Sequence, residues 1–221
     1  MKLFESLLPP TVVLREADPR RFSADLSTLH NEEAALVRRA VDKRKREYTA
    51  GRTLAREVFR ELGVDDLVLV NDAERAPQWP DGFVGSITHT HFWCAAAAAR
   101  QREHAGIGLD VERDLPLKEN LWDTICTPEE QEWLLTQSGE DRGWLGKVLF
   151  SAKEAAYKAQ YGVSATFLGF HAMRVTLRDN RFQAVFARDV QSCFRVGDQL
   201  QGRWVRRDGL IATAVVLPPN W

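Results

Sequence analysis

The sequence predicts an α+β protein made of two similar lobes that meet near residue 105. A long helical pattern followed by short strands occupies the first half, and the same order recurs in the second half. The 221 residues are enough for one large domain or two small ones. Apolar residues make up 44% of the chain and charged residues 28%, which is typical of a globular protein. We therefore divide the chain into an N-terminal lobe, residues 1–104, and a C-terminal lobe, residues 105–221.

Each predicted element follows from the local spacing of apolar residues. In the first half, a period of about 3.6 predicts a helix over residues 29–62, ended by Gly63. Alternating or continuous apolar runs predict strands near residues 67–70, 84–88 and 92–99. In the second half we expect a strand near 106–112, then helices near 128–135 and 142–161. Four strands close the chain, near residues 170–177, 181–187, 201–206 and 210–217.

Composition excludes several classes of protein. The longest uncharged apolar stretch, residues 92–99, is far shorter than the ~20 residues needed to cross a bilayer. No signal peptide is evident, and three cysteines without CxxC spacing argue against a disulfide framework or zinc ribbon. A net charge of −1 argues against general nucleic-acid binding, which depends on summed positive charge. We expect a soluble, cytoplasmic protein that binds no nucleic acid and has no transmembrane segment.

Two arginines of the first helical region lie on its apolar stripe. Arg44 and Arg52 stand four residues before and after Tyr48, whereas most other basic residues of this helix lie off the stripe. A guanidinium directed toward a packed interior needs an anion, because an unpaired buried charge is costly. The anion is either a carboxylate of the protein or a bound phosphate, for which the planar guanidinium is well suited.

The segment over residues 106–112 combines an apolar face with two carboxylates. Ile107, Leu109 and Val111 alternate with Gly106, Gly108, Asp110 and Glu112, so the two glycines leave room for another group on the carboxylate face. Carboxylates two residues apart on a strand have Cβ atoms only ~7 Å apart, at a rise of ~3.3 Å per residue. This spacing either binds a cation such as Mg²⁺ or is an exposed polar strand face.

The second long helix carries a Lys-Glu-x-x-x-Lys pattern. Glu154 and Lys158 are one turn apart, on the side that also holds Phe150, Tyr157 and Tyr161. The pair is either an exposed ion pair or part of a cleft that the aromatic residues cover. In a cleft, Glu154 supplies a third carboxylate, and Lys158 stabilises charge on a transferring group.

In their order and spacing, these motifs resemble those of one enzyme family. The motifs are Ala50-Gly51-Arg52, Ala76-Pro77-Gln78-Trp79-Pro80, Gly85-Ser86-Ile87-Thr88-His89, residues 106–112 and residues 150–158. Together they are similar to 4′-phosphopantetheinyl transferases of the Sfp type, and most of all to the branch of enterobactin synthase component D. The similarity covers about residues 40–170 and 200–217.

The resemblance implies a pseudo-twofold fold in which each lobe is a small antiparallel sheet packed on a long helix, with the active site between the lobes. It implies transfer of the 4′-phosphopantetheine arm of coenzyme A to a serine of an apo acyl or peptidyl carrier protein. The by-product is adenosine 3′,5′-bisphosphate, and the cofactor is Mg²⁺, with Mn²⁺ as an alternative.

The resemblance also implies roles for residues at matching positions. The metal ligands are Asp110, Glu112 and Glu154, and the catalytic residues are Glu154, Lys158 and Asp110. Arg75 stands near the position where relatives often place a coenzyme A-binding lysine. The expected coenzyme A contacts are Arg44, Arg52, Arg75, Thr88, His89, Asp110, Lys153 and Lys158.

Two other functions use the same residues. A metal-dependent phosphohydrolase would use the three carboxylates on a nucleotide or on coenzyme A, and a non-catalytic nucleotide- or RNA-binding module would use the basic helix. We expect a monomer, because two lobes of one chain already complete the site.

Overall fold

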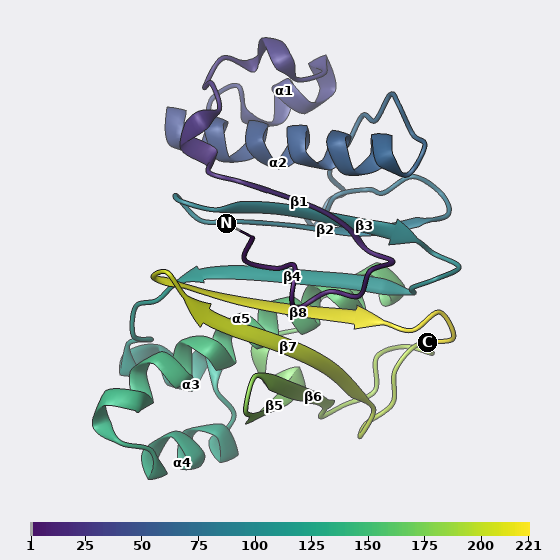
Figure 1. Cartoon of the computed structure of the whole chain (residues 1–221). Helices are drawn as coiled ribbons and strands as arrows, with labels where there is room; N and C mark the ends of the chain where they lie inside the picture. The colour runs from purple at the N-terminus through teal and green to yellow at the C-terminus, as the bar shows by residue number, and fades with distance from the viewer. Residues whose placement is uncertain (1) are drawn as a thin grey trace.

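Residues 2–221, which the computed structural model describes, form two antiparallel sheets of three and five strands, each packed against a long helix (Figure 1). The N-terminal sheet has the strand order β1-β3-β2, and the helix α2 lies across it (Figure 1). This lobe contains β1 (Val13–Ala17), α1 (Asn31–Val37), α2 (Asp42–Glu61), β2 (Phe83–His89) and β3 (Cys94–Arg100), with short 3₁₀ turns at Pro19–Arg21 and Leu26–Thr28.

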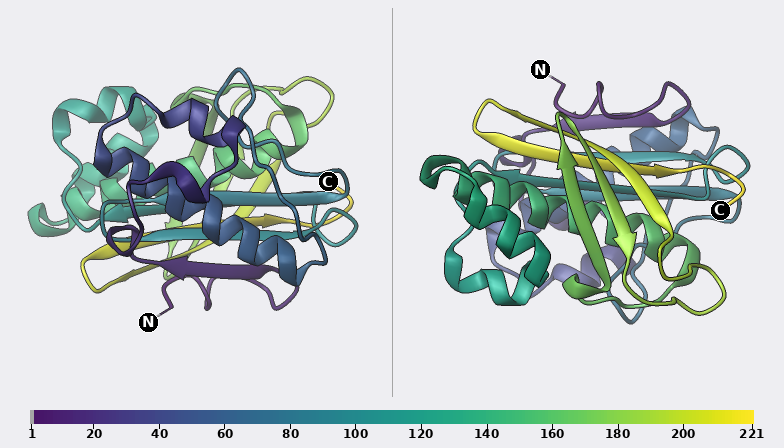
Figure 2. Two further views of the ribbon diagram at one scale, coloured as in Figure 1. Left: turned by 90° about the horizontal axis from the view of Figure 1, so that it is seen from above. Right: turned by 90° about the horizontal axis from the view of Figure 1, so that it is seen from below.

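The C-terminal sheet has the strand order β4-β8-β7-β6-β5, and the helix α5 packs mainly on β4 and β8 (Figure 2). The predicted α+β class, with an antiparallel sheet and a long helix in each lobe, is confirmed. The elements are β4 (Gly106–Arg113), α3 (Trp122–Ile125), α4 (Pro128–Thr136), α5 (Gly139–Ser164), β5 (Met173–Arg178), β6 (Arg181–Phe186), β7 (Gln199–Arg207) and β8 (Leu210–Leu217), with 3₁₀ turns at Glu119–Leu121 and Phe170–Ala172.

The two sheets meet where β2 lies beside β4. Side-chain hydroxyls make the hydrogen bonds across this junction: Ser86 Oγ accepts from the Leu109 amide, and Thr88 Oγ1 accepts from the Val111 amide, each at 3.0 Å. All four residues are buried. Because a buried amide without a partner is costly, these two hydroxyls stabilise the edge of β4 in place of backbone carbonyls.

The N-terminal segment before β1 packs against both lobes. Leu3 and Phe4 are fully buried in a cluster that contains residues of β3, β4 and β8. The Glu16 carboxylate accepts hydrogen bonds from the amides of Leu3 and Phe4 and from the indole of Trp93. The strands of the two sheets divide between residues 100 and 106, but the core under them is continuous.

Two glycines of β4 allow α5 to approach closely. A Cβ on Gly106 would lie 2.4 Å from the carbonyl oxygen of Ala159, and a Cβ on Gly108 would lie 1.8 Å from that of Ala155. The space that the sequence predicts on this face of β4 is therefore filled by the backbone of α5. This contact places the side chains of Asp110 and Lys158 next to each other.

The prediction of a single helix over residues 29–62 is wrong. The segment forms two helices, α1 and α2, separated by residues 38–41. Val41 is the N-cap of α2 and has an extended backbone, with φ −67° and ψ 154°. Asp42 in the first turn of α2 favours a helix start there, because a carboxylate stabilises the positive end of the helix dipole. Val41 is 72% exposed, so it does not belong to the buried stripe.

The strand expected at residues 67–70 does not form, and the strand β1 was not predicted. Leu67 and Leu69 are buried as the alternation suggests, but Leu69 hydrogen-bonds side chains: its amide donates to Glu33, and its carbonyl accepts from Arg52. Burial of Leu67 and Leu69, without pairing to another strand, therefore explains the alternation of apolar residues in this segment.

None of the helices in residues 2–221 combines the length and apolar character that a membrane span requires.

Candidate active site

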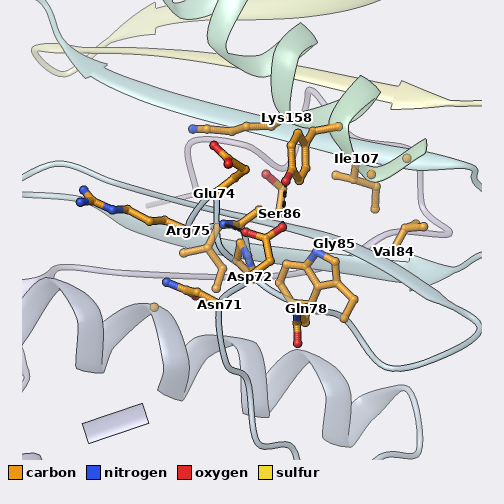
Figure 3. A pocket seen from close by; sticks show the side chains of 18 of the residues that line it. Asn71, Asp72, Glu74, Arg75, Gln78, Val84, Gly85, Ser86, Ile107 and Lys158 are labelled. Atoms are coloured by element: carbon orange, nitrogen blue, oxygen red, sulfur yellow. Dashed lines mark hydrogen bonds between the residues drawn. The ribbon is translucent and has the colours of Figure 1, made fainter. Parts of the chain in front are cut away.

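A cavity of about 510 Å³ lies between the lobes. Its walls come from α2, the loop over residues 71–79, β2 and the second half of α5 (Figure 3). Five of the residues that the sequence predicts as coenzyme A contacts line this cavity: Arg44, Arg52, Arg75, His89 and Lys158. Four of them belong to the N-terminal lobe and one to the C-terminal lobe, so the fold gathers cations from both halves of the chain at one place.

Arg52 is buried without a carboxylate partner. Its Nε donates to the Leu69 carbonyl at 2.9 Å, and its terminal nitrogen donates to Asn71 Oδ1 at 2.6 Å. Its guanidinium lies 4.2 Å from the centre of the Tyr48 ring. Burial lowers the pKa of Arg52. Among residues 2–221 no carboxylate lies within 4.0 Å of it, which favours a bound anion over an internal ion pair.

Arg44 and His89 form a second polar pair on the cavity wall. Arg44 donates to His89 Nε2 at 2.7 Å, so the imidazole is an acceptor at this nitrogen and is neutral. The other ring nitrogen, Nδ1, lies 3.6 Å from Glu47 Oε2. Burial, with the positive charges of Arg44, Lys158 and Lys43, lowers the pKa of His89 to about 4. Arg44 thus keeps its charge for a ligand.

The lowered pKa of His89 predicts a loss of stability in mild acid. Since the pKa falls from 6.5 to about 4 on folding, the unfolded chain binds more protons between these values, and stability decreases as the pH falls through this window. Between pH 7 and pH 5 we expect the wild type to lose about 2 kcal/mol more unfolding free energy than His89→Gln. Urea unfolding of both proteins at the two pH values measures this difference. An equal pH dependence in the two proteins would contradict it.

Arg75 and Lys158 approach the cavity from opposite lobes. Figure 3 shows their side chains extending toward the same side, Arg75 from the loop and Lys158 from α5. Lys158 donates to the Leu109 carbonyl and to Asp110 Oδ1, both at 2.9 Å. Lys158 therefore joins the cationic cavity to the carboxylates of β4.

Three carboxylates gather on the β4–α5 side of the cavity. Asp110 is buried and also accepts a hydrogen bond from Ser151 at 2.8 Å, while Glu112 pairs with Lys147 at 3.1 Å. Burial, together with the charge of Asp110, raises the pKa of Glu112. Burial also raises the pKa of Glu154, opposed by Lys158 and reinforced by Asp110 and Glu112. The three groups are thus close enough to repel one another.

These carboxylates suit Mg²⁺ as oxygen donors. Within residues 2–221, no three His, Cys, Asp or Glu side chains are spaced as a complete metal site. Mg²⁺ does not need such a set, because it commonly takes one or two protein carboxylates and fills its remaining positions with water and phosphate oxygens. Burial raises the pKa values of both Glu112 and Glu154, and nearby carboxylates add to the rise, so a cation among these groups would offset their mutual repulsion. The donor set fits a hard divalent cation.

Three predicted coenzyme A contacts do not line the large cavity: Lys153, Thr88 and Asp110, of which Asp110 contacts the cavity residue Lys158. Lys153 is 2% exposed; its ammonium lies 2.8 Å from Glu130 Oε2 and donates to the Phe170 carbonyl at 2.9 Å. Its ammonium therefore ties α5 to α4, and the residue borders a second, smaller cavity next to Glu154. The Thr88 hydroxyl is buried in the junction of the sheets, where it accepts from Val111.

Sequence reasoning missed two other parts of the site. Asp72 accepts a hydrogen bond from Tyr161 of α5 at 2.8 Å, across the cavity (Figure 3). A smaller cavity of about 190 Å³ adjoins Glu154 and is lined by apolar residues that include Phe167, Leu168 and Met173. Tyr157 lines both cavities. Tyr157, on the aromatic side of the second long helix, was the available signal for this apolar wall.

Comparison with known proteins places both halves of the chain in one family. Residues 32–99 match the 4′-phosphopantetheinyl transferase N-terminal domain, and residues 106–214 match the 4′-phosphopantetheinyl transferase superfamily. The crystal structure of Thermotoga maritima holo-[acyl-carrier-protein] synthase is also similar, with 19% identity and a TM-score of 0.40, over 52% of this chain and 64% of that one.

Two relatives of similar length carry the family's name, and a third is an enterobactin synthase component D. The chain is 33% identical to 4′-phosphopantetheinyl transferase Npt of Nocardia iowensis, over 96% of this chain and 99% of the relative. It is 35% identical to 4′-phosphopantetheinyl transferase Svp of Streptomyces mobaraensis, over 97% and 89%. It is 34% identical to enterobactin synthase component D of Escherichia coli K12, over 77% and 82%. The chain therefore belongs to the 4′-phosphopantetheinyl transferases and is an enzyme of that family.

Proposed function

We propose that this enzyme uses Mg²⁺ to transfer the 4′-phosphopantetheine arm from coenzyme A to a serine of an apo acyl or peptidyl carrier protein, releasing adenosine 3′,5′-bisphosphate. The observation that supports this most is the position of Lys158. It lines the cationic cavity and contacts Asp110 of the carboxylate cluster, so a phosphate group and a divalent cation can meet there.

The two cavities suit the two chemical parts of coenzyme A. Arg44, Arg52 and Arg75 supply positive charge for its phosphates in the larger cavity. The smaller cavity, lined by Phe167, Leu168 and other apolar side chains, suits the uncharged arm. Because Tyr157 borders both, the phosphorus that joins the two parts would lie near Glu154 and Lys158.

Asp110, Glu112 and Glu154 would hold Mg²⁺. When bound, this ion neutralises negative charge on the pyrophosphate. The serine oxygen forms a bond to the phosphorus of the arm, and the bond from that phosphorus to the bridging oxygen breaks. Adenosine bisphosphate leaves with the electron pair, and Lys158 stabilises its negative charge. Glu154 accepts the serine proton, directly or through water, and its raised pKa suits this role.

Intact-mass spectrometry of an apo carrier protein tests this function. Incubation with the enzyme, coenzyme A and Mg²⁺ should add about 340 Da, the mass of the arm, and EDTA should abolish the gain. Asp110→Ala should abolish it too, whereas Asp123→Ala, an exposed carboxylate of α3, should not. Consumption of coenzyme A without a gain in carrier mass would instead support the phosphohydrolase.

One chain supplies both halves of the cavity, since its walls come from α2 and β2 of one lobe and α5 of the other. We therefore also propose that the enzyme acts as a monomer.

A further inference from the structure

The loop that carries Arg75 is a tight turn closed by Asp72. The Asp72 amide donates to the Ala76 carbonyl at 2.9 Å, and Asp72 Oδ1 accepts from the Ala76 amide at 2.8 Å. Arg75 has a left-handed backbone, with φ of 67°, which is costly for a residue other than glycine. Such a conformation persists when its surroundings enforce it, so the bonds of Asp72 bear directly on where Arg75 lies.

The second carboxylate oxygen of Asp72 is bound by the opposite lobe. Tyr161, near the end of α5, donates its hydroxyl hydrogen to Asp72 Oδ2 at 2.8 Å; this bond is the dashed line at Asp72 in Figure 3. Burial and this hydrogen bond raise the pKa of Tyr161 to about 12, so the hydroxyl remains a donor at neutral pH. The residues are 89 positions apart in the sequence.

Asp72 does not neutralise the arginine that it positions. Within residues 2–221, neither Asp72 nor Arg75 has an oppositely charged partner within 4.0 Å. The carboxylate is bound by an amide and a hydroxyl, both uncharged donors. The Arg75 guanidinium therefore keeps its full charge for an anion in the cavity, on the side toward which Lys158 also extends (Figure 3).

We propose that the Tyr161–Asp72 hydrogen bond is an interlobe contact that positions Arg75 to bind a phosphate of coenzyme A. Asp72 and Tyr161 are positioning residues, because they act through Arg75 on the ligand. This inference rests on the proposed function, since it takes coenzyme A as the ligand.

A double-mutant cycle tests the inference. Tyr161→Phe removes only the hydroxyl, and Asp72→Ala removes both bonds of the carboxylate. For each variant we expect the Kd and KM for coenzyme A to rise about tenfold, equivalent to ~1.4 kcal/mol, with kcat within about twofold of the wild type. In an Arg75→Ala background, Tyr161→Phe should have no further effect on either constant. Asp65→Ala, an exposed carboxylate of the same lobe, is the control for loss of an acidic side chain.

Several outcomes would overturn the inference. Unchanged Kd and KM in Tyr161→Phe would show that the contact does not position a binding group. An equal additional loss in the Arg75→Ala background would show that it acts through another residue. A fall in kcat with an unchanged KM would make its role catalytic. Far-UV circular dichroism of each variant checks that it is folded. If the wild type itself bound no coenzyme A, the proposed function would fail instead, and the two failures are therefore distinguishable.

Discussion

Replacing Glu154 with glutamine is expected to slow transfer to the carrier protein by roughly 10²- to 10⁴-fold, the usual contribution of a positioned general base. The amide keeps the size and polarity of the side chain but cannot take the serine proton. Glu154 is suited to this role because burial and the charges of Asp110 and Glu112 raise its pKa. Single-turnover mass spectrometry of the carrier protein measures the rate.

The control for this variant is Glu140→Gln, in the exposed first turn of the same helix, which should transfer at the wild-type rate. Metal binding is measured separately with Mn²⁺ by electron paramagnetic resonance, comparing Glu154→Gln with Asp110→Asn. A Glu154→Gln enzyme that bound Mn²⁺ and kept near-wild-type turnover would eliminate Glu154 as the base.

Replacing Gly108 with alanine should cost at least about 3 kcal/mol of unfolding free energy, at the upper end of the range for overpacked cores. The added Cβ would lie 1.8 Å from the Ala155 carbonyl oxygen, so either the backbone of β4 or that of α5 must move. Any such movement separates Asp110 from Lys158, and we expect transfer to be lost along with stability. Urea unfolding and the carrier-mass assay measure the two effects.

Gly139→Ala is the matched control, because a Cβ there meets nothing within 4 Å and the residue is exposed at the start of α5. Its unfolding free energy should stay within about 0.5 kcal/mol of the wild type. If Gly108→Ala were equally stable, the close approach of α5 to β4 would not hold in solution.

The parts of the site that lie within one element could be predicted from the sequence. The alternation over residues 106–112 places Asp110 and Glu112 on one face of a strand, and that strand is β4. The helical spacing of Arg44, Tyr48 and Arg52 similarly groups them on one stripe of α2, which borders the cavity. In both segments a single period decides which side chains lie together, so local reasoning was sufficient.

Contacts between distant elements could not be predicted in this way. Lys153 and Glu130 form a buried ion pair, but no period relates a residue of α5 to the third residue of α4. The resemblance to the family placed Lys153 at the phosphates, whereas its side chain lies on the α4 side of the helix. The partnership of Asp72 with Tyr161 depends likewise on how the two lobes pack, which neither segment encodes alone.

The hydroxyl bonds between β2 and β4 have a consequence for how substrates enter. The Val111 amide donates to the Thr88 hydroxyl. His89 of the cationic wall directly follows Thr88, and Asp110 of the carboxylate cluster directly precedes Val111, so each group is one residue away from this hydrogen bond. Because β2 and β4 belong to different sheets, the separation between these groups is held by the two buried hydroxyl bonds across the junction. A hinge motion of the lobes would break both buried bonds. We therefore expect the ligand to be admitted by movements of loops and side chains, while these bonds hold the two halves of the site at one separation.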